Sequence, residues 1–274
     1  MKMLTRDYPE VLSAVVMHNG EIIAQTSQDD TLYPQYSITK SIVSLAIGML
    51  IAENQLSLSA TVGELLHTPE TAPLSSVTLE ELLTMRSGLN QELLFADRKT
   101  CPDYLNACIA SEIGTKRFFS INANAYLAGL MAEKTAGCNL SEFIAERIFK
   151  PLGIDAYEFE YDTEGHFFGA SGLKLRTVDL AKIGYSMTYG GLYPIEWINE
   201  ALRPHTVSRD GRTYGYYFWL HPDYYYMEPD RTKANPMIKI DQVRALQREV
   251  SLMPVMSNLR MVIIDDAELM TEAF

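Results

Sequence analysis

Residues 37–53 read SITKSIVSLAIGMLIAE, and this stretch decides both the fold and the candidate chemistry. Its apolar residues fall mostly at helical spacing, which predicts a buried helix beginning at Ser37. Ser37 and Lys40 form an S-x-x-K pair. Residues i and i+3 of a helix lie on one face, with Cβ atoms about 5–6 Å apart. The stretch therefore predicts that the Lys40 amine can reach the Ser37 hydroxyl.

Two interpretations of this pair stay open at the level of sequence. In the first, burial lowers the pKa of Lys40, because desolvation disfavours the charged form, and the neutral amine takes the proton of Ser37. In the second, Ser37 only caps the helix and Lys40 is solvated. The chain carries its own control, Ser171-Gly172-Leu173-Lys174, in which the serine lies in a Gly-flanked loop instead of opening an apolar helix.

Composition narrows the class of protein. The 274 residues allow one or two domains, and a net charge of −12 argues against non-specific binding of nucleic acid. Three cysteines without a CxxC and five scattered histidines without HExxH build neither a disulfide framework nor a zinc site, so no metal or cofactor is expected.

The longest apolar stretch, Ser41 to Ala52, is shorter than the ~20 residues that span a bilayer. With no secretion signal at the polar N-terminus, we expect a cytoplasmic protein that does not bind membranes. The sequence leaves its oligomeric state open.

Strand patterns stand at both ends of the chain and helical patterns between them. Residues 12–17 and 21–25 flank Asn19-Gly20, a strong hairpin signal. Residues 214–220, 250–256 and 260–264 also have strand character, and Pro254 predicts an edge strand or a bulge. The expected helices are 123–136, 140–149 and 178–187, besides one that begins after Thr78. This order predicts a sheet made from both termini, with a helical insertion.

Several segments, taken together and in order, resemble the serine β-lactamase and penicillin-binding-protein superfamily, especially its class C-like branch. They are YSITKS at 36–41, VTLEELLTMRSGL at 77–89, FFSINANAYLAGL at 118–130 and IFKPLGI at 148–154. The resemblance implies an α+β, β-lactamase-like fold: an antiparallel sheet from both termini flanked by helices, with an inserted all-helical lobe. It implies one catalytic unit, with an α/β lobe of approximately residues 1–60 and 165–274 and a helical lobe of approximately 61–164.

The family's second motif falls at Ser120-Ile121-Asn122. The class C-like branch has a tyrosine at the first position, whereas Ser-x-Asn is the form of class A β-lactamases and many penicillin-binding proteins. The resemblance implies that Ser120 relays a proton and that Asn122 orients the substrate. The alternative is that both residues merely cap the helix that begins near Ala123.

The family's third motif, Lys-Thr/Ser-Gly or His-x-Gly, has no match after residue 214. Lys233-Ala234-Asn235 lies at about the right place but lacks the glycine, and Lys233 is the candidate substrate-binding residue there. No glycine follows Gly215, and residues 230–249 read unlike the family. The Glu-x-x-Leu-Asn run of a class A deacylating glutamate is also absent, which disfavours that class.

These observations predict a serine hydrolase that forms an acyl-enzyme with a small-molecule ester or amide. In it, Ser37 is the nucleophile, Lys40 the base and Ser120 the proton relay. The missing third motif keeps open an alternative: a catalytically impaired binding or sensor protein with the same fold. The tyrosines and Trp219 of the 214–226 region fit either a substrate-binding surface or the core.

Overall fold

The computed structural model describes residues 12–25, 30–89, 101, 103–189, 191–209 and 211–220, and the backbone of two strands, 254–257 and 260–264. The chain divides into two compact units. The first consists of Met1–Tyr33, Leu175–Gly190 and His221–Phe274, and the second of Pro34–Lys174 and Gly191–Leu220. The bounds that the sequence predicts for the two lobes stay a prediction.

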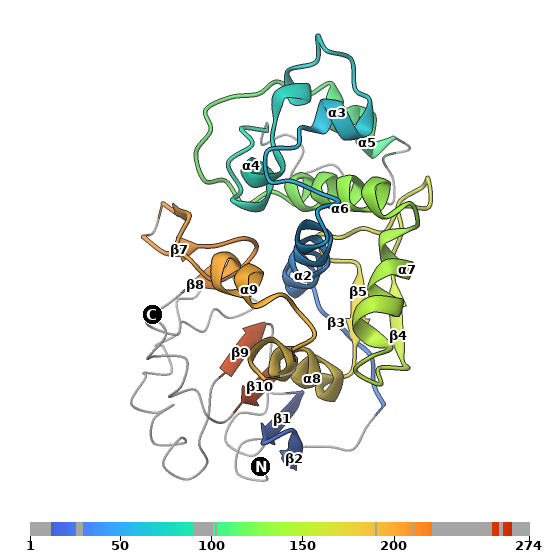
Figure 1. The fold of residues 1–274 in the computed structure, drawn as a ribbon, viewed down its shortest axis with the longest axis vertical. Helices are drawn as coiled ribbons and strands as arrows, with labels where there is room; N and C mark the ends of the chain where they lie inside the picture. The colour runs from blue at the N-terminus through green and yellow to red at the C-terminus, as the bar shows by residue number, and fades with distance from the viewer. Residues whose placement is uncertain are drawn as a thin grey trace. The chain divides into compact units, whose positions relative to one another are not determined.

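Strands from both ends of the chain form the sheet of the first unit, in the order β2-β1-β10-β9 (Figure 1). The elements are β1 (Ser13–His18), β2 (Glu21–Gln25), β9 (Pro254–Ser257), β10 (Arg260–Ile264) and the helix α8 (Thr177–Thr188), which packs against β1 and β10. Asn19 and Gly20 turn the β1–β2 hairpin with positive φ angles of 49° and 80°. Pro254 begins β9, which lies at the edge of the sheet among the described strands, a position that proline tolerates. The predicted hairpin, edge strand and sheet from both termini are confirmed.

One pairing of this sheet differs from the antiparallel arrangement that the sequence predicts. β1 pairs with β2 and β9 with β10 in antiparallel fashion, but β1 and β10 run parallel. A parallel pair needs a crossover rather than a tight turn. Because β1 and β10 are joined by nearly the whole chain, the connection sets no antiparallel direction for this pair.

The second unit holds most of the helices. Its elements are β3 (Tyr33–Pro34), which starts at the unit boundary, α2 (Ile38–Ala52), α3 (Val62–Leu66), η1 (Pro73–Ser76), α4 (Leu79–Leu83), α5 (Tyr104–Ile109), α6 (Asn122–Ala136), α7 (Leu140–Ile144), η3 (Ala145–Phe149), β4 (Tyr157–Phe159), β5 (Leu173–Leu175), α9 (Ile195–Ala201), β6 (Thr206–Val207), β7 (Thr213–Tyr214) and β8 (Trp219–Leu220). Two small sheets accompany them, β3-β5-β4 and β6-β7-β8. The family-like α+β fold class is thus confirmed.

The helix α2 is the centre of the second unit, and α6, α7 and α9 pack against it (Figure 1). Its residues from Ile42 to Leu50 are all buried, as the apolar run predicts. α6 begins one residue earlier than predicted and ends at Ala136, and Gly137, with a φ of 69°, is the predicted C-cap. None of the helices in the described part of the chain is long and apolar enough to cross a membrane.

The predicted single strand over residues 214–220 is wrong. Gly215 donates its N–H to the carbonyl of Phe218 at 2.8 Å, and Tyr217 has a φ of 67°, so the chain turns between β7 and β8. The aromatic residues give the stretch strand propensity along its length. A bond to a distant segment holds the turn instead: Tyr216 donates its N–H to the carbonyl of Ala201 at 3.0 Å, and this carbonyl lies so close that a Cβ on Gly215 would be 2.0 Å from it.

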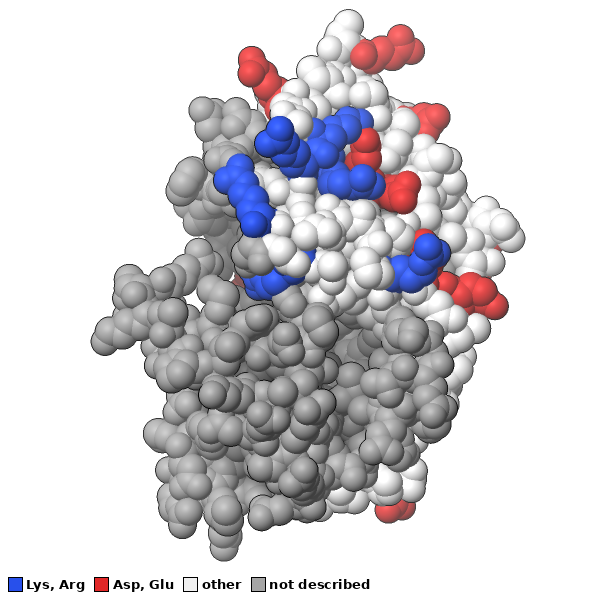
Figure 2. Space-filling view, turned by 90° about the vertical axis from the view of Figure 1, so that its left-hand side faces the viewer, with Lys and Arg blue, Asp and Glu red and all other residues white. Residues whose placement is uncertain are grey.

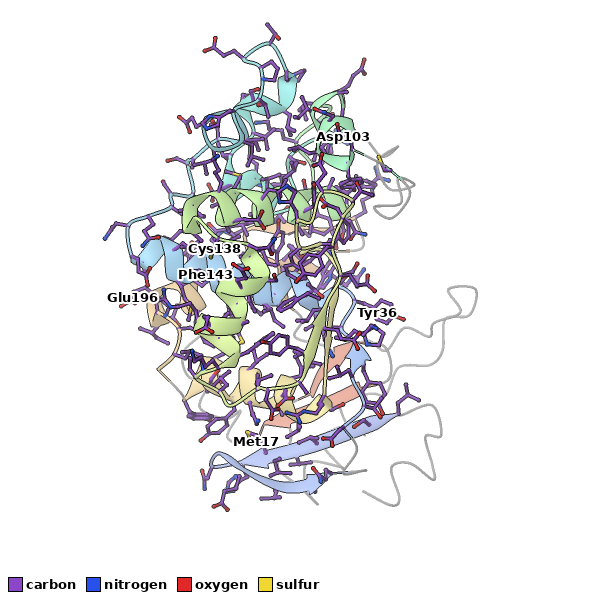
Figure 3. All side chains as sticks on the ribbon, turned by 90° about the vertical axis from the view of Figure 1, so that its right-hand side faces the viewer. Met17, Tyr36, Asp103, Cys138, Phe143 and Glu196 are labelled. Atoms are coloured by element: carbon purple, nitrogen blue, oxygen red, sulfur yellow. The ribbon has the colours of Figure 1, made fainter. Side chains whose placement is uncertain are left out.

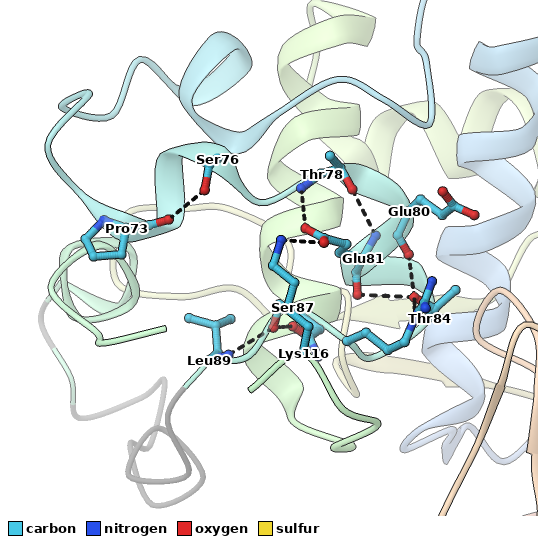
Figure 4. A network of polar contacts seen from close by, with 11 residues as sticks. Pro73, Ser76, Thr78, Glu80, Glu81, Thr84, Ser87, Leu89 and Lys116 are labelled. Carbon is cyan, nitrogen blue, oxygen red and sulfur yellow. Dashed lines mark hydrogen bonds and ion pairs between the residues drawn. The ribbon is translucent and has the colours of Figure 1, made fainter. Parts of the chain in front are cut away.

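A capped short helix supports the segment that leads into α6. Thr78 and Glu81 form a reciprocal capping box at the start of α4, and Lys116 pairs with Glu81 (Figure 4). Just after α4, the carbonyl of Met85 accepts the N–H of Phe119 at 2.8 Å. The Ser87 hydroxyl donates to Oδ1 of Asn124, a buried residue of α6. These bonds fix residues 114–121 against α4 and the first turn of α6.

We predict that Gly48→Ala destabilises the protein by about 1–3 kcal/mol, because a Cβ at Gly48 would lie 2.1 Å from Cδ1 of the buried Trp197. Gly129→Ala in α6 is the matched control. Its Cβ would meet only the flexible end of Leu140, at 3.3 Å, and alanine favours the helix, so we expect a change within about 1 kcal/mol. Urea unfolding measures both. Equal free energies of unfolding for the two variants would contradict the packing described here.

Candidate active site

The Lys40 ammonium group is the junction of three segments that are far apart in sequence. Its Nζ donates to Ser37 Oγ at 3.0 Å, to Oδ1 of Asn122 at 3.0 Å and to the carbonyl oxygen of Ala170 at 2.7 Å. An ammonium has three N–H donors, so all three are used. The arrangement brings together a serine hydroxyl, an amine and an amide, as the sequence predicts for Ser37, Lys40 and Asn122.

Burial sets the protonation of this amine. Lys40 is 3% exposed, and no carboxylate pairs with it in the described part of the chain. Desolvation lowers the pKa of Lys40 from 10.5 to about 7. A large fraction of Lys40 is therefore neutral near pH 7. The neutral amine has two N–H donors for Asn122 and Ala170, and its lone pair can accept from the hydroxyl of Ser37.

Ser37 does not act as a cap. It precedes α2, but its side chain makes no capping bond. The N–H groups of Ile38 and Thr39 are used on the carbonyls of Gln35 and Tyr36, at 3.1 Å each. Tyr36 has a φ of 46°, a left-handed conformation that is strained for a tyrosine. It is 48% exposed at the start of α2 (Figure 3). Backbone strain and an exposed ring thus lie directly before the candidate nucleophile.

The second S-x-x-K pair lacks this environment. Lys174 forms an ion pair with Glu158 at 2.6 Å, and this contact raises the pKa of Lys174. Its side chain is 33% exposed, in contrast to buried Lys40. Two identical spacings in one chain therefore give opposite pKa shifts. Burial on a helix, and not the spacing, makes the amine of Lys40 a candidate base.

The second-motif residues behave differently from each other. Asn122 is the first residue of α6, and it is exposed although its oxygen holds buried Lys40. Ser120 is also exposed, and within the described part of the chain its side chain makes no hydrogen bond to Ser37 or Lys40. The helix has Ile121 at its N-cap position without a side-chain bond, so neither Ser120 nor Asn122 caps it.

Two contacts of the site are not predicted by the sequence. The Ala170 acceptor is a backbone carbonyl, so its side chain carries no signal of the role. The Ser41 hydroxyl donates to the carbonyl of Tyr217 at 2.9 Å, which ties the β7–β8 turn to α2. Ser41 is four residues after Ser37 and therefore on the same helix face. The helix spacing could have revealed Ser41, although not its partner.

The remaining candidates divide between the core, the surface and the part of the chain that is not described. Lys233, the tyrosines at 224–226 and the region 230–249 lie outside the described residues. Tyr214, Tyr216 and Tyr217 are buried, whereas Trp219 is 41% exposed. These three tyrosines thus belong to the core, whereas Trp219 is the exposed aromatic residue among the described positions of this region.

The fold and the convergence of Ser37, Lys40 and Asn122 point to the class of β-lactamase-like proteins. A family model described as Beta-lactamase matches residues 6–194, more than half of the chain. The chain therefore belongs to the β-lactamase family. A model of a different family, described as DNA polymerase III, delta subunit, matches residues 218–273. This second match covers the part of the chain in which the third motif is missing. A search of curated proteins found no significant match.

Solved structures agree with this fold. A penicillin-binding protein from Bacillus halodurans has a TM-score of 0.64 and 18% identity, over 80% of this chain and 82% of that one. An octameric penicillin-binding protein homologue from Pyrococcus abyssi has a TM-score of 0.61 and 22% identity over 75% of this chain, which spans 60% of that protein. A D-stereospecific amidohydrolase from Streptomyces sp. has a TM-score of 0.57 and 19% identity, over 71% of this chain and 73% of that one. At these identities the likeness shows the fold.

The lowered pKa of Lys40 predicts how stability depends on pH. Between its folded pKa of about 7 and its ordinary value of 10.5, the unfolded chain binds more protons at this residue than the folded chain does. This difference makes the free energy of unfolding rise with pH across that window. The cost of burying the charge is present in full below about pH 7 and disappears towards pH 10.5.

We expect the free energy of unfolding to rise more steeply from pH 7 to pH 10 for the wild type than for Lys40→Met, which cannot titrate there. Urea unfolding over this range measures the difference in slope. Lys174→Met is the control. Its free energy of unfolding should keep the steep rise from pH 7 to pH 10, because the pKa of Lys174 is raised rather than lowered. Parallel pH profiles for the wild type and Lys40→Met would show that burial does not lower the pKa of Lys40.

Proposed function

We propose that the protein is a serine hydrolase that cleaves a small-molecule ester or amide through an acyl-enzyme on Ser37. The observation that carries the proposal is the 3.0 Å contact between Ser37 Oγ and the amine of Lys40, whose pKa burial lowers to about 7. A general base works best when its pKa lies near the working pH. A cytoplasmic location belongs to the same proposal.

The proton path follows from the hydrogen bonds. Neutral Lys40 accepts the proton of Ser37 as Oγ forms a bond to the substrate carbonyl carbon. Asn122 and the carbonyl of Ala170 hold the amine in place through the step, because both accept from it in either protonation state. The leaving group then takes a proton from Lys40, with exposed Ser120 as the proposed relay. Water hydrolyses the ester on Ser37 and regenerates the hydroxyl.

Negative charge on the carbonyl oxygen needs donors placed in advance. The N–H of Ser37 is one candidate, because in the described part of the chain no backbone acceptor takes it, whereas the next two N–H groups are used. It lies at the start of α2, where the helix dipole favours negative charge. In this family a second N–H comes from the strand of the third motif. Lys233, the proposed substrate-binding residue there, lies outside the described residues.

A binding or sensor protein without turnover is the second candidate function. The observation that favours it is the match of residues 218–273 to a different family model, in the place of the third motif. Such a protein would keep the Ser37–Lys40 pair but lack the second oxyanion donor. Loss of one such donor costs about 10²–10³ in kcat in a well-studied hydrolase.

We expect Ser37→Ala to abolish hydrolysis of p-nitrophenyl esters and labelling by a fluorophosphonate probe. Ser171→Ala, which removes the serine of the second S-x-x-K, is the matched control and should keep both. Release of p-nitrophenol and mass spectrometry of the labelled protein measure the two effects. Equal labelling of the wild type and Ser37→Ala would contradict the assignment of the nucleophile. Labelling of Ser37 without turnover would favour the second candidate.

A further inference from the structure

One acceptor of Lys40, the carbonyl of Ala170, lies in a loop and not at the start of a helix. On the face drawn in Figure 2, lysines and arginines lie at the surface near aspartates and glutamates, whereas Lys40 is 3% exposed and finds its acceptors inside the second unit. Ala170 belongs to residues 160–172, the β4–β5 loop. A loop lacks the regular backbone bonds of a helix, so other contacts must hold this carbonyl at the amine.

A tyrosine of α6 anchors the β4–β5 loop. The hydroxyl of buried Tyr126 donates to Oδ2 of Asp162 at 2.7 Å. Burial and the neighbouring Asp162 carboxylate raise the pKa of Tyr126, so the hydroxyl stays protonated and is the donor. The other carboxylate oxygen, Oδ1, accepts the N–H groups of Glu164 and His166 at 2.9 Å each. Asp162 thus joins α6 to a turn of the loop, residues 162–166.

A second link connects α6 to the same turn. Nδ1 of His166 lies 2.5 Å from Oε1 of Glu133. Glu133 is seven residues after Tyr126, and residues at this spacing share one face of a helix. Asn139, just after α6, donates its Nδ2 to the carbonyl of Gly165 at 2.9 Å. Three side chains therefore fix the turn to α6 and to the residues that follow it.

The backbone carries this attachment from the turn to Ala170. Phe168 donates its N–H to the carbonyl of Glu160 at 2.9 Å, which closes the β4–β5 loop on itself. Gly169 packs directly against α2, since a Cβ there would lie 3.0 Å from Cγ2 of Val43. Ala170 follows and is buried. The position of its carbonyl therefore depends on where the anchored turn lies.

The helix α6 thus places two acceptors of Lys40. Asn122, its first residue, accepts directly through its side chain. Tyr126 is four residues later, on the same side of the helix, and through Asp162 it holds the loop that carries Ala170. Reacting groups keep a productive geometry when further hydrogen bonds fix the residues that contact them.

We propose that Tyr126 and Asp162 are positioning residues of the hydrolase. Their hydrogen bond holds the Ala170 carbonyl at Lys40 and so keeps the amine directed at Ser37. Both residues act through Lys40 and not on the substrate. The inference rests on the proposed hydrolase function and adds two residues to those that support its base. Misplacement of a reacting group by about 1 Å can cost about 10²-fold in rate.

Removal of a single hydroxyl tests the role of Tyr126. Tyr126→Phe keeps the ring, and we expect kcat for p-nitrophenyl valerate to fall about tenfold with KM changed by less than about twofold. Tyr161→Phe is the matched control, because the Tyr161 hydroxyl lies in the same loop but bonds Ser141 of α7, at 3.1 Å. This control should keep the wild-type kcat. Circular dichroism verifies that both variants fold.

Two substitutions test the role of Asp162. Asp162→Asn keeps an oxygen for the N–H groups of the turn, and its amide N–H can donate to the Tyr126 oxygen. We expect it to keep about a third or more of the wild-type kcat, whereas Asp162→Ala should lose at least as much as Tyr126→Phe. Equal losses in Asp162→Asn and Asp162→Ala would overturn the proposal, because the hydrogen bonds would then not carry the effect.

Titration of Lys40 by NMR separates this proposal from the hydrolase function. The ¹³Cε inflection of Lys40 in Tyr126→Phe should lie at lower pH than in the wild type, because a carbonyl acceptor that favours the charged amine is held less firmly. Tyr161→Phe should keep the wild-type inflection. A lowered inflection in a protein without hydrolysis would refute the hydrolase and keep the anchorage of Lys40. Ser37-dependent hydrolysis, with kcat and the inflection both unchanged in Tyr126→Phe, would keep the hydrolase and overturn the proposal.

Discussion

The burial of one lysine amine is the constraint on which the site depends. A buried ammonium is costly unless each of its donors finds an acceptor. In this chain the acceptors come from the start of α2, the start of α6 and the carbonyl of Ala170, so these segments must meet at Lys40. Other residues support the packing of these segments. The missing side chain of Gly48 leaves room for Trp197 to pack against α2, and the hydrogen bonds of Met85 and Ser87 fix the segment that leads into α6.

Lys40 differs from three lysines at the surface of the described part of the chain. Lys116, Lys150 and Lys174 have glutamate partners at the surface, and these partners raise the pKa of Lys150 and Lys174. Lys40 has neutral acceptors only, and burial lowers its pKa to about 7. The absence of a carboxylate among its described contacts matters, because a neighbouring negative charge would favour the charged amine and remove the base.

Local rules predicted much of the fold and a part of the site. The hairpin at Asn19-Gly20, the helices α2, α6 and α8 and the cap at Thr78 follow from turn residues, apolar spacing and capping, which act over a few residues. The parallel β1–β10 pair and the β7–β8 turn depend on contacts between distant segments, which no local pattern contains. The carbonyl of Ala170 belongs to the same kind: a backbone group acquires its role only from the packing around it.

The most direct test of this account is an NMR titration of the ¹³Cε resonance of Lys40, assigned by comparison with Lys40→Arg. The account predicts an inflection at about pH 7, the value that burial without a carboxylate partner produces. An inflection near 10.5, the ordinary pKa of a lysine, would show that Lys40 stays charged at neutral pH and cannot take the proton of Ser37.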